Sequence, residues 1–261
     1  MISIITPVRN GEKHIETCVQ NVIEQDCPTI EHIVVDGGSD DGTIEIVKIY
    51  AAKHNHLRYI SENDNGQSNA MNKGIAMARG DIIGILNVDD FYEPDTLCRI
   101  EYLFRNKKKP AMIVGNCNVW DDSGSLLYVN RPERLRIEDL LLGWRVNPHP
   151  VNPTAYFYHK DLHKIIGPYD EDEHFAMDLD FIFRAVQKAH TTYFNEVWGN
   201  YRLIEGTKTV SDQKKGESAL RAQRLRGKYQ RQLPVFKQAN VFLMKLKHDI
   251  FHKLNRLRIH K

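Results

Sequence analysis

The first hundred residues alternate short apolar runs with segments in which apolar side chains recur every three or four positions. A short apolar run bounded by turn residues is typical of a strand buried on both faces of a sheet, and the longer spacing is typical of an amphipathic helix. Strands are predicted at residues 2–8, 30–35, 57–61 and 81–86, with helices over 15–23, 44–51, 67–78 and 97–104. Because strand and helix alternate, we expect right-handed βαβ units and a mostly parallel sheet.

Beyond residue 110 the pattern becomes more hairpin-like. Short strands joined by polar turns are predicted at residues 112–114, 118–120, 126–129, 156–158 and 201–203, and helices at 137–144, 162–166 and 177–186. Between them, Asn147–Pro153 contains three prolines, too many for regular structure. A rigid, polar loop of this kind suits the wall of a binding site. The fold expected from both halves is α/β, a Rossmann-like mixed sheet flanked by helices.

The C-terminal part of the chain differs from the rest in charge. Residues 207–261 carry 15 Lys or Arg against three acids, a net charge of +12, whereas residues 1–206 have a net charge of −10. Helical spacing from Glu217 onward predicts a basic helical tail. Its last part has an apolar stripe of Ala239, Leu243, Leu246, Ile250, Leu254 and Leu257, accompanied by Lys237, Lys245, Lys247, Lys253, Arg256 and Arg258.

This pattern in residues 235–261 is typical of a helix lying in an anionic membrane surface. A helix packed on its own domain or in a homodimer fits it equally well. A nucleic-acid partner is disfavoured, because Phe236, Phe242 and Phe251 fit an apolar helix face better than a series of stacking aromatics.

Composition adds few constraints. With 261 residues, 41% of them hydrophobic and 27% charged, the chain can bury a substantial core. The four cysteines show no C-x-x-C pair, so we expect free thiols. We also expect no signal peptide and no transmembrane segment, hence a cytoplasmic protein; the tail leaves open a peripheral place at the inner face of the cell membrane.

Two adjacent carboxylates, Asp89 and Asp90, follow the predicted strand at 81–86. Open α/β sheets bind ligands at the carboxyl ends of their strands, where a carboxylate pair can hold a hard divalent cation. We expect Asp90 to face solvent, so that removing it costs little stability. A turn with two solvated aspartates is the simpler interpretation of this pair alone.

Two further residues have candidate roles with equally simple alternatives. Lys73 lies on a helix expected to be capped near Ser68, where helix amides and the ammonium could face an anion. An exposed surface lysine fits as well. Asp178 lies in the first turn of a predicted helix, where a carboxylate can serve merely as a cap. Neither G-x-G-x-x-G nor a Walker lysine is present, which disfavours a dinucleotide or P-loop site.

Five motifs together carry a resemblance that none of them carries alone. They are Thr6–Glu12 (TPVRNGE), Val35–Thr43 (VDGGSDDGT), Asn65–Gly74 (NGQSNAMNKG), Leu86–Tyr92 (LNVDDFY) and Met177–Asp180 (MDLD). In order and spacing they resemble the family 2 glycosyltransferases of GT-A fold, over residues 1 to about 205. The resemblance implies an inverting, metal-assisted enzyme that transfers a sugar from a nucleotide-diphosphate donor to a hydroxyl of a glycan or lipid-linked acceptor, in cell-envelope polysaccharide biosynthesis.

By the same resemblance, residues 1–110 form the nucleotide-sugar-binding half of one domain, residues 111–206 its acceptor-binding half, and residues 207–261 the tail. Asp178 would be the catalytic base. Asp90 would hold Mn²⁺ or Mg²⁺, and Asp89 would contact either the ribose or the metal. The residues expected around the donor are Pro7, Arg9, Glu12, Asp36, Ser39, Asn72, Lys73 and Asp89. Of these, Asp36 would accept hydrogen bonds from the base, and Asn72 and Lys73 would lie beside the diphosphate.

Two positions depart from the family pattern. Asn87 replaces the first acid of the common D-x-D-D, and Met177 replaces the Glu that often precedes the base. Two other functions stay open: a non-catalytic GT-A scaffold recruited to the membrane by its tail, and a sugar-1-phosphate nucleotidyltransferase. The second would share the sheet but needs an early Gly-rich loop with Arg and Lys, of which only Arg9 is present.

Overall fold

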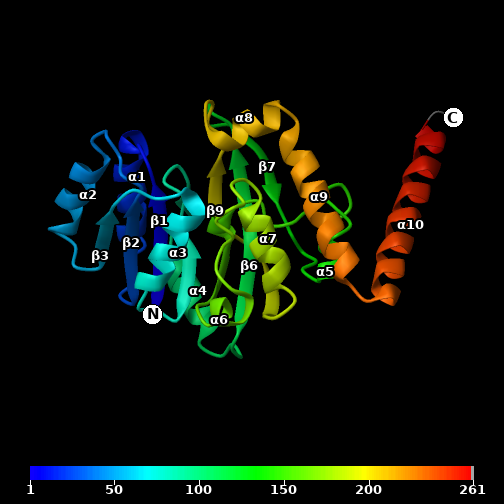
Figure 1. Cartoon of the computed structure of the whole chain (residues 1–261), viewed down its shortest axis with the longest axis horizontal. Helices are drawn as coiled ribbons and strands as arrows, with labels where there is room; N and C mark the ends of the chain where they lie inside the picture. Colours follow the sequence, from blue (N-terminus) through cyan, green and yellow to red (C-terminus); the bar gives the residue numbers. More distant parts are fainter. Residues whose placement is uncertain (260–261) are drawn as a thin grey trace.

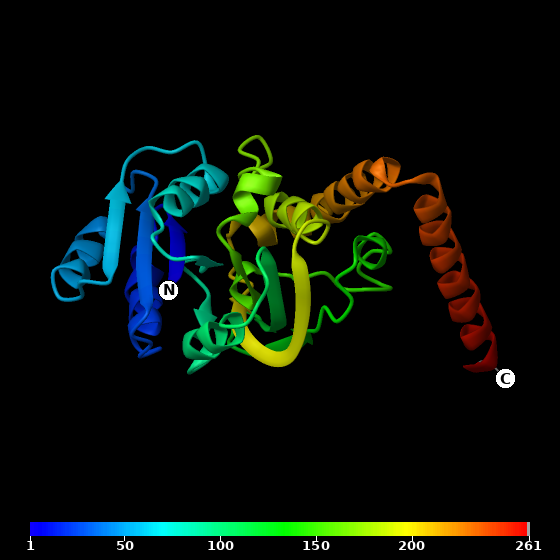
Figure 2. The same ribbon diagram turned by 90° about the horizontal axis from the view of Figure 1, so that it is seen from below.

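A mixed nine-stranded sheet with helices on both faces forms the body of the protein, from which one long helix projects (Figure 1, Figure 2). The structure is a computed structural model that describes residues 1–259, with all their side chains except those of Lys208, Gln213 and residues 252–259. The strand order is β3-β2-β1-β4-β8-β6-β9-β5, and β7 pairs with β6.

The N-terminal half confirms the predicted alternation of strand and helix. Its elements are β1 (Ile2–Val8), α1 (Glu12–Ile23), β2 (Ile30–Asp36), α2 (Thr43–Ala51), β3 (Leu57–Ser61), α3 (Gln67–Met77) and β4 (Ile82–Ile85). The strands β3, β2, β1 and β4 are parallel neighbours, so their carboxyl ends share one edge of the sheet.

The second half adds strands of both directions. Its elements are β5 (Phe91–Tyr92), α4 (Thr96–Phe104), β6 (Ala111–Trp120), β7 (Leu126–Asn130), α5 (Ile137–Leu140), the 3₁₀ turn η1 (Pro153–Ala155), β8 (Tyr156–His159), α6 (Leu162–Ile166), α7 (Met177–Ala185), β9 (His190–Arg202), α8 (Lys208–Lys214), α9 (Glu217–Gln232) and α10 (Val235–Ile259). β8 is antiparallel to β4 and β6, and β9 is parallel to β6. The carboxyl ends of β6 and β9 therefore reach the same edge as those of β1 and β4.

Two local predictions are wrong for physical reasons. The separate strands at 112–114 and 118–120 are one strand, β6, whose register against β9 shifts around Asn116. The register shift interrupts the period-two pattern, and Gly115 beside it leaves room for the Trp198 ring, which a Cβ there would approach to 2.5 Å. Helix α3 begins at Gln67 as predicted, but its N-cap is Gly66 and not Ser68, whose hydroxyl instead donates to the backbone oxygen of Glu173.

The sheet alternates its apolar side chains between two cores. On one face Ile5, Ile83 and Ile85 pack with α3, α5, α6, α7 and α9. On the other face Ile4, Ile82 and Leu86 pack with α1 and α4. Because both faces are covered, the polar ends of the strands are left as the main place for a ligand.

The predicted tail is only partly separate from the body. Tyr229 and Leu233 of α9 and Val241 of α10 are buried in the core cluster that contains α7. The division at residue 206 stays a prediction, but packing continues through residues 207–233. The side chains of Leu254, Leu257, Lys253, Arg256 and Arg258, which belong to the predicted stripe and its charges, lie outside the described residues.

The remaining stripe on α10 is not covered by the body. Leu243, Leu246 and Ile250 are each about half exposed, at 52%, 45% and 50%. The views in Figures 1 and 2 agree that α10 extends away from the sheet. Packing on its own domain therefore does not account for this stripe. No helix in the described part of the chain is long and apolar enough to cross a membrane.

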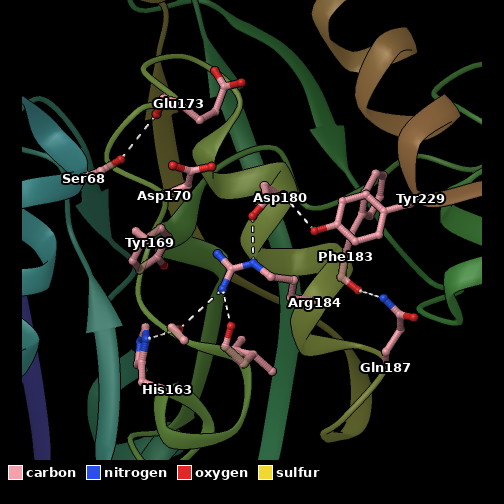
Figure 3. A network of polar contacts seen from close by, with 12 residues as sticks. Ser68, His163, Tyr169, Asp170, Glu173, Asp180, Phe183, Arg184, Gln187 and Tyr229 are labelled. Atoms are coloured by element: carbon pink, nitrogen blue, oxygen red, sulfur yellow. Dashed lines mark hydrogen bonds and ion pairs between the residues drawn. The ribbon is translucent and has the colours of Figure 1, made fainter. Parts of the chain in front are cut away.

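A buried polar network attaches α9 to α7 (Figure 3). The Asp180 carboxylate accepts hydrogen bonds from Arg184 Nε at 2.7 Å and from the Tyr229 hydroxyl at 2.7 Å. Arg184 also donates to the backbone oxygen of Ile166 at the end of α6. One carboxylate thus joins three helices, and Asp178 lies half a turn before it on α7.

We predict that Tyr229→Phe lowers the free energy of unfolding by about 1–2 kcal/mol, because the buried Asp180 oxygen loses a donor. Urea denaturation measures the change. Tyr102→Phe is the matched control, since Tyr102 is 60% exposed. Equal, negligible losses in the two variants would show that α9 is not attached through this bond.

Candidate functional site

Two adjoining cavities lie at the edge where β1, β4 and β9 end. The Asp89 cavity, of about 590 Å³, is lined by Pro7, Arg9, Asp64, Asp89 and Arg202 among others. The Asp178 cavity, of about 230 Å³, is lined by His149–Pro153 and by residues 174–179. Gln67, Asn87, Tyr201 and Thr209 line both cavities, so the two share a wall. The loop Asn147–Pro153, called the Pro-rich loop below, forms one wall of the Asp178 cavity.

The Asp89 carboxylate enters its cavity from the turn after β4. The backbone N–H of Leu86 donates to Ile5 O, and that of Asp90 donates to Asn87 O, which ends the strand and closes the turn. Asp89 is partly exposed. Burial raises its pKa, while its own backbone N–H and the nearby charges of His14 and Arg202 partly offset that effect.

Asp90 occupies a different environment, and the expectation that it faces solvent is wrong. Its side chain is only 2% exposed. Its carboxylate accepts hydrogen bonds from Asn152 Nδ2 at 2.8 Å, Asn87 Nδ2 at 3.0 Å and the backbone N–H of Arg202 at 3.0 Å. Burial and the charge of Asp89 raise the pKa of Asp90. Hydrogen-bond donors of the protein itself therefore already bind the oxygens of the Asp90 carboxylate.

The same contacts explain why an asparagine stands at position 87. Its amide nitrogen donates to Asp90, and its Oδ1 accepts from Gln67 Nε2 at 2.9 Å. An aspartate here would place a second carboxylate against the buried Asp90, and like charges so close are costly. Asn87 thus joins the turn after β4 to the first turn of α3.

Two arginines give the Asp89 cavity its positive charge. Arg9 follows β1 and is exposed, and Arg202 ends β9 with its guanidinium 4.9 Å from the centre of the Phe91 ring. Planar guanidinium groups suit phosphate oxygens, so this cavity can accommodate a diphosphate beside Asp89.

Asp178 lies in the first turn of α7 and lines the second cavity. The Tyr156 hydroxyl of β8 donates to Asp178 Oδ1 at 3.3 Å. Burial raises the pKa of Asp178 from 3.8 to about 6, and the Tyr156 hydrogen bond opposes that rise. The group is mostly ionised at neutral pH yet basic enough to accept a proton from a substrate.

Several residues expected around the donor line neither cavity. Asp36 is fully buried, and its carboxylate accepts from the backbone N–H and hydroxyl of Ser39 and from Ser61 Oγ. The Ser39 hydroxyl also accepts from the backbone N–H of Asn10, which fixes the turn after β1. Glu12 lies against Gly42. Asp36 and Ser39 therefore shape the loops next to Arg9.

Asn72 and Lys73 likewise interact with residues of the protein outside the Asp89 cavity. Asn72 Nδ2 donates to Glu171 Oε1 at 2.9 Å, and its Oδ1 accepts from the backbone N–H of Tyr169. Lys73 Nζ pairs with Glu62 at 2.7 Å. Neither side chain lines the Asp89 cavity, so the structure gives no support to their expected position beside a diphosphate.

The residues of the Asp89 cavity could bind a divalent cation only if a bound ligand supplied further oxygen atoms. Among the described side chains, no cluster of three or more His, Cys, Asp or Glu could hold a metal ion. Asp89 is a partly buried carboxylate facing a cavity, and Mg²⁺ or Mn²⁺ commonly takes one or two carboxylates together with substrate phosphates. The donor set therefore suits a cation that binds with a diphosphate.

Sequence reasoning missed residues that come from distant parts of the chain. Asp64, Gln67, Tyr201, Arg202 and Thr209 line the Asp89 cavity, and Asp212 and Arg221 line the Asp178 cavity. Arg202 had a usable signal, an arginine in a predicted strand, and Gln67 lies within the Asn65–Gly74 motif. Thr209, Asp212 and Arg221 depend on where α8 and α9 fold back.

Comparisons with known proteins find a family model, sequence relatives and similar folds. The family model described as Glycosyl transferase family 2 matches residues 3–166. A PGL/p-HBAD biosynthesis glycosyltransferase of Mycobacterium tuberculosis is 29% identical over 223 residues, which cover 81% of each chain. Glycosyltransferase GlyG of Streptococcus pneumoniae is 32% identical over 176 residues, 62% of this chain and 58% of that protein.

Solved structures show the fold. S. aureus TarS 1-349 in complex with UDP has a TM-score of 0.63 at 20% identity, covering 77% of this chain and 60% of that chain. Mannosyltransferase PcManGT from Pyrobaculum calidifontis, in complex with GDP-Man and Mn²⁺, has a TM-score of 0.60 at 22% identity, covering 85% of this chain and 62% of that one. This chain thus spans less than two thirds of either structure, and the likeness establishes a GT-A fold.

The contrast between the two neighbouring carboxylates gives a prediction. Asp90→Ala should lower the free energy of unfolding by about 3 kcal/mol, because three N–H donors lose their acceptor. Asp89→Ala should change it by less than about 1 kcal/mol, since its carboxylate is partly exposed. Urea denaturation of both variants measures the difference. If the two are equally stable, Asp90 does not hold the site together.

Proposed function

Because the chain belongs to glycosyl transferase family 2, we propose that it transfers a sugar from a nucleotide-diphosphate donor to a hydroxyl group of a glycan or lipid-linked acceptor, with inversion at the sugar carbon. The observation that carries the proposal is the position of Asp178, a partly buried carboxylate with a pKa near 6 in a cavity that shares a wall with the Asp89 cavity. One relative is named a PGL/p-HBAD biosynthesis glycosyltransferase, and S. aureus TarS 1-349 has been solved in complex with UDP-GlcNAc.

The donor occupies the Asp89 cavity in this proposal. Pro7 and Arg9 lie where β1 ends, and Asp64 forms the adjoining wall. We place the nucleotide along this side, with Asp36 and Ser39 holding the loops that surround it. Arg202 replaces Lys73 as the cation nearest the diphosphate, because Arg202 lines the cavity and Lys73 pairs with Glu62.

We assign the metal contact to Asp89 rather than Asp90. Asp89 faces the cavity, whereas the Asp90 carboxylate already accepts hydrogen bonds from three donors of the protein. A bound Mn²⁺ or Mg²⁺ would neutralise charge on the leaving diphosphate. Asp90 would then act indirectly, by holding Asn87, the Pro-rich loop and the end of β9 in place.

Asp178 acts as the general base. Its carboxylate takes the proton from the acceptor hydroxyl while the new bond forms on the face of the sugar opposite the departing diphosphate. One carboxylate suffices for a single in-line displacement, which inverts the sugar carbon. Tyr156 holds Asp178 Oδ1 and keeps its pKa from rising further.

We predict that the rate falls as pH drops through about 6, because Asp178 must be ionised to accept a proton and its pKa lies there. Asp178→Asn should reduce kcat by at least ~10² and leave donor affinity within a few-fold. The assay follows nucleoside diphosphate release from a panel of sugar nucleotides with Mn²⁺ or Mg²⁺. Near wild-type turnover in the variant would place the base elsewhere.

The control for this prediction is Tyr156→Phe. Loss of the phenol removes a hydrogen bond that favours the carboxylate, so the acid limb of the pH profile should move to higher pH while the protein stays folded. An unshifted limb would mean that the titrating group is not Asp178.

We further propose that α10 places the enzyme peripherally on a membrane, where lipid-linked acceptors are found. The support is the half-exposed apolar stripe, of which Leu246 is 45% and Ile250 50% exposed, beside the exposed Lys247. An apolar stripe with flanking cations fits the interface of an anionic bilayer. A homodimer would cover the same stripe.

Leu246→Gln/Ile250→Gln should weaken co-sedimentation with anionic vesicles by at least about tenfold, because two apolar anchors are lost. The matched control is Leu126→Gln/Leu127→Gln on β7, where the exposed fractions are nearly the same, 48% and 51%. The membrane proposal fails if wild type stays in the supernatant at low salt. Concentration-dependent dimerisation, lost in the α10 variant alone, would then identify a protein contact.

A further inference from the structure

Two cations are held partly out of water where α9 faces the following helix and the loop after α5. The Arg226 guanidinium lies over Gly143: a Cβ there would be 3.4 Å from Nε and 3.5 Å from Cζ. Lys245 of α10 donates from Nζ to Gln230 Oε1 at 3.1 Å. Arg226 and Gln230 are four residues apart on α9, so they lie on the same side of that helix. Lys245 is thereby held beside Arg226.

Among the side chains that the structure describes, no acid forms an ion pair with either cation. Burial lowers the pKa of Arg226, and burial together with the charge of Arg226 lowers the pKa of Lys245. Among the described side chains, neither residue forms an ion pair. Other arginines of similar exposure do: Arg58 pairs with Glu31, Arg184 with Asp180 and Arg221 with Asp212. Charged groups removed from water are normally paired, so two adjacent cations without a carboxylate indicate that the partner is a ligand.

The position of this pair connects it with the proposed acceptor side. Gly143 is followed by Trp144, whose ring packs against His149 with centroids 5.1 Å apart, and His149 lines the Asp178 cavity. Burial, with the charge of Arg226 as a second cause, lowers the pKa of His149 to about 4, so His149 is neutral at pH 7 and adds no competing charge. Neither Arg226 nor Lys245 lines the Asp89 cavity.

We propose that Arg226 and Lys245, with Gln230 orienting the lysine, form a second anion site, specific for a phosphate or diphosphate ester. A guanidinium offers two parallel donors to phosphate oxygens, and the ammonium supplies a further donor and charge. The site lies where α9, α10 and the loop after α5 meet, and neither cation lines the Asp89 cavity. It is therefore distinct from the donor diphosphate position, and it suits the phosphate of an acceptor, whether that acceptor is a lipid with its headgroup at α10 or a soluble phosphorylated molecule.

The experiment compares variants that each remove one positive charge from the full chain. Arg226→Gln and Lys245→Gln alter the site; Arg224→Gln and Lys247→Gln are matched controls, each two residues away on the same helix and exposed. Calorimetric titration with inorganic phosphate, without sugar nucleotide, measures affinity. None of the four residues lines the Asp89 cavity, so phosphate bound there contributes equally to every variant.

We expect the two site variants to bind phosphate about tenfold more weakly than wild type, the loss typical of a charge-assisted hydrogen bond, and the two controls to stay within about twofold. Equal affinities in all four variants, or no phosphate-dependent heat in wild type, would overturn the site. Because turnover is not scored, this result is independent of whether the glycosyl-transfer proposal holds.

Co-sedimentation with vesicles then identifies the source of the phosphate. If wild type prefers phosphatidic acid over phosphatidylcholine vesicles and Arg226→Gln loses that preference while Arg224→Gln keeps it, the ligand is a lipid headgroup. If Arg226→Gln keeps the preference but has lost phosphate affinity, the ligand is a soluble phosphate ester.

Discussion

The burial of the Asp90 carboxylate is the constraint on which the rest of the site depends. Its three donors come from the turn after β4, the Pro-rich loop and the end of β9. These segments are distant in sequence, and each contributes a wall to one or both cavities. Hydrogen bonds in a buried position are costly to break, so a single carboxyl group fixes the relative positions of Asn87, Asn152 and Arg202. The cavities are therefore preformed by the fold.

Three carboxylates near this edge lie in different environments. Asp90 is enclosed by donors, Asp89 faces a cavity that also contains Arg202, and Asp178 has the Tyr156 hydroxyl as a donor. Burial raises the pKa of all three, but the surrounding donors and charges decide what each can bind. One edge of the sheet thus holds three carboxylates in three different environments.

The basic C-terminal part combines two kinds of surface. Through Tyr229 and Leu233 it belongs to the core, and Tyr229 reaches the helix that carries Asp178. Beyond Pro234 it presents apolar and basic side chains that the body leaves uncovered. Helix α9 is thus attached to the helix that carries Asp178, whereas the stripe on α10, the next helix, is exposed.

The sequence by itself determined the parallel half of the sheet and the family. An apolar run such as Ile2–Val8 indicates a strand buried on both faces, and the helical spacing of α1 indicates a helix buried on one face. Both are local signals, because each can be read from one segment alone. The five motifs likewise located Pro7, Arg9, Asp89 and Asp178 at the cavities.

Only the tertiary structure decided what each polar residue contacts. Asp89 and Asp90 are adjacent and identical in type, so no local pattern separates them; their difference arises from Asn152 and Arg202, 62 and 112 residues beyond Asp90. Lys73 and Asn72 pair with groups that a motif cannot reveal, and the bulge in β6 depends on the Trp198 ring. Contacts between distant segments form only when the chain folds, and they decide which of the candidate side chains face the cavities.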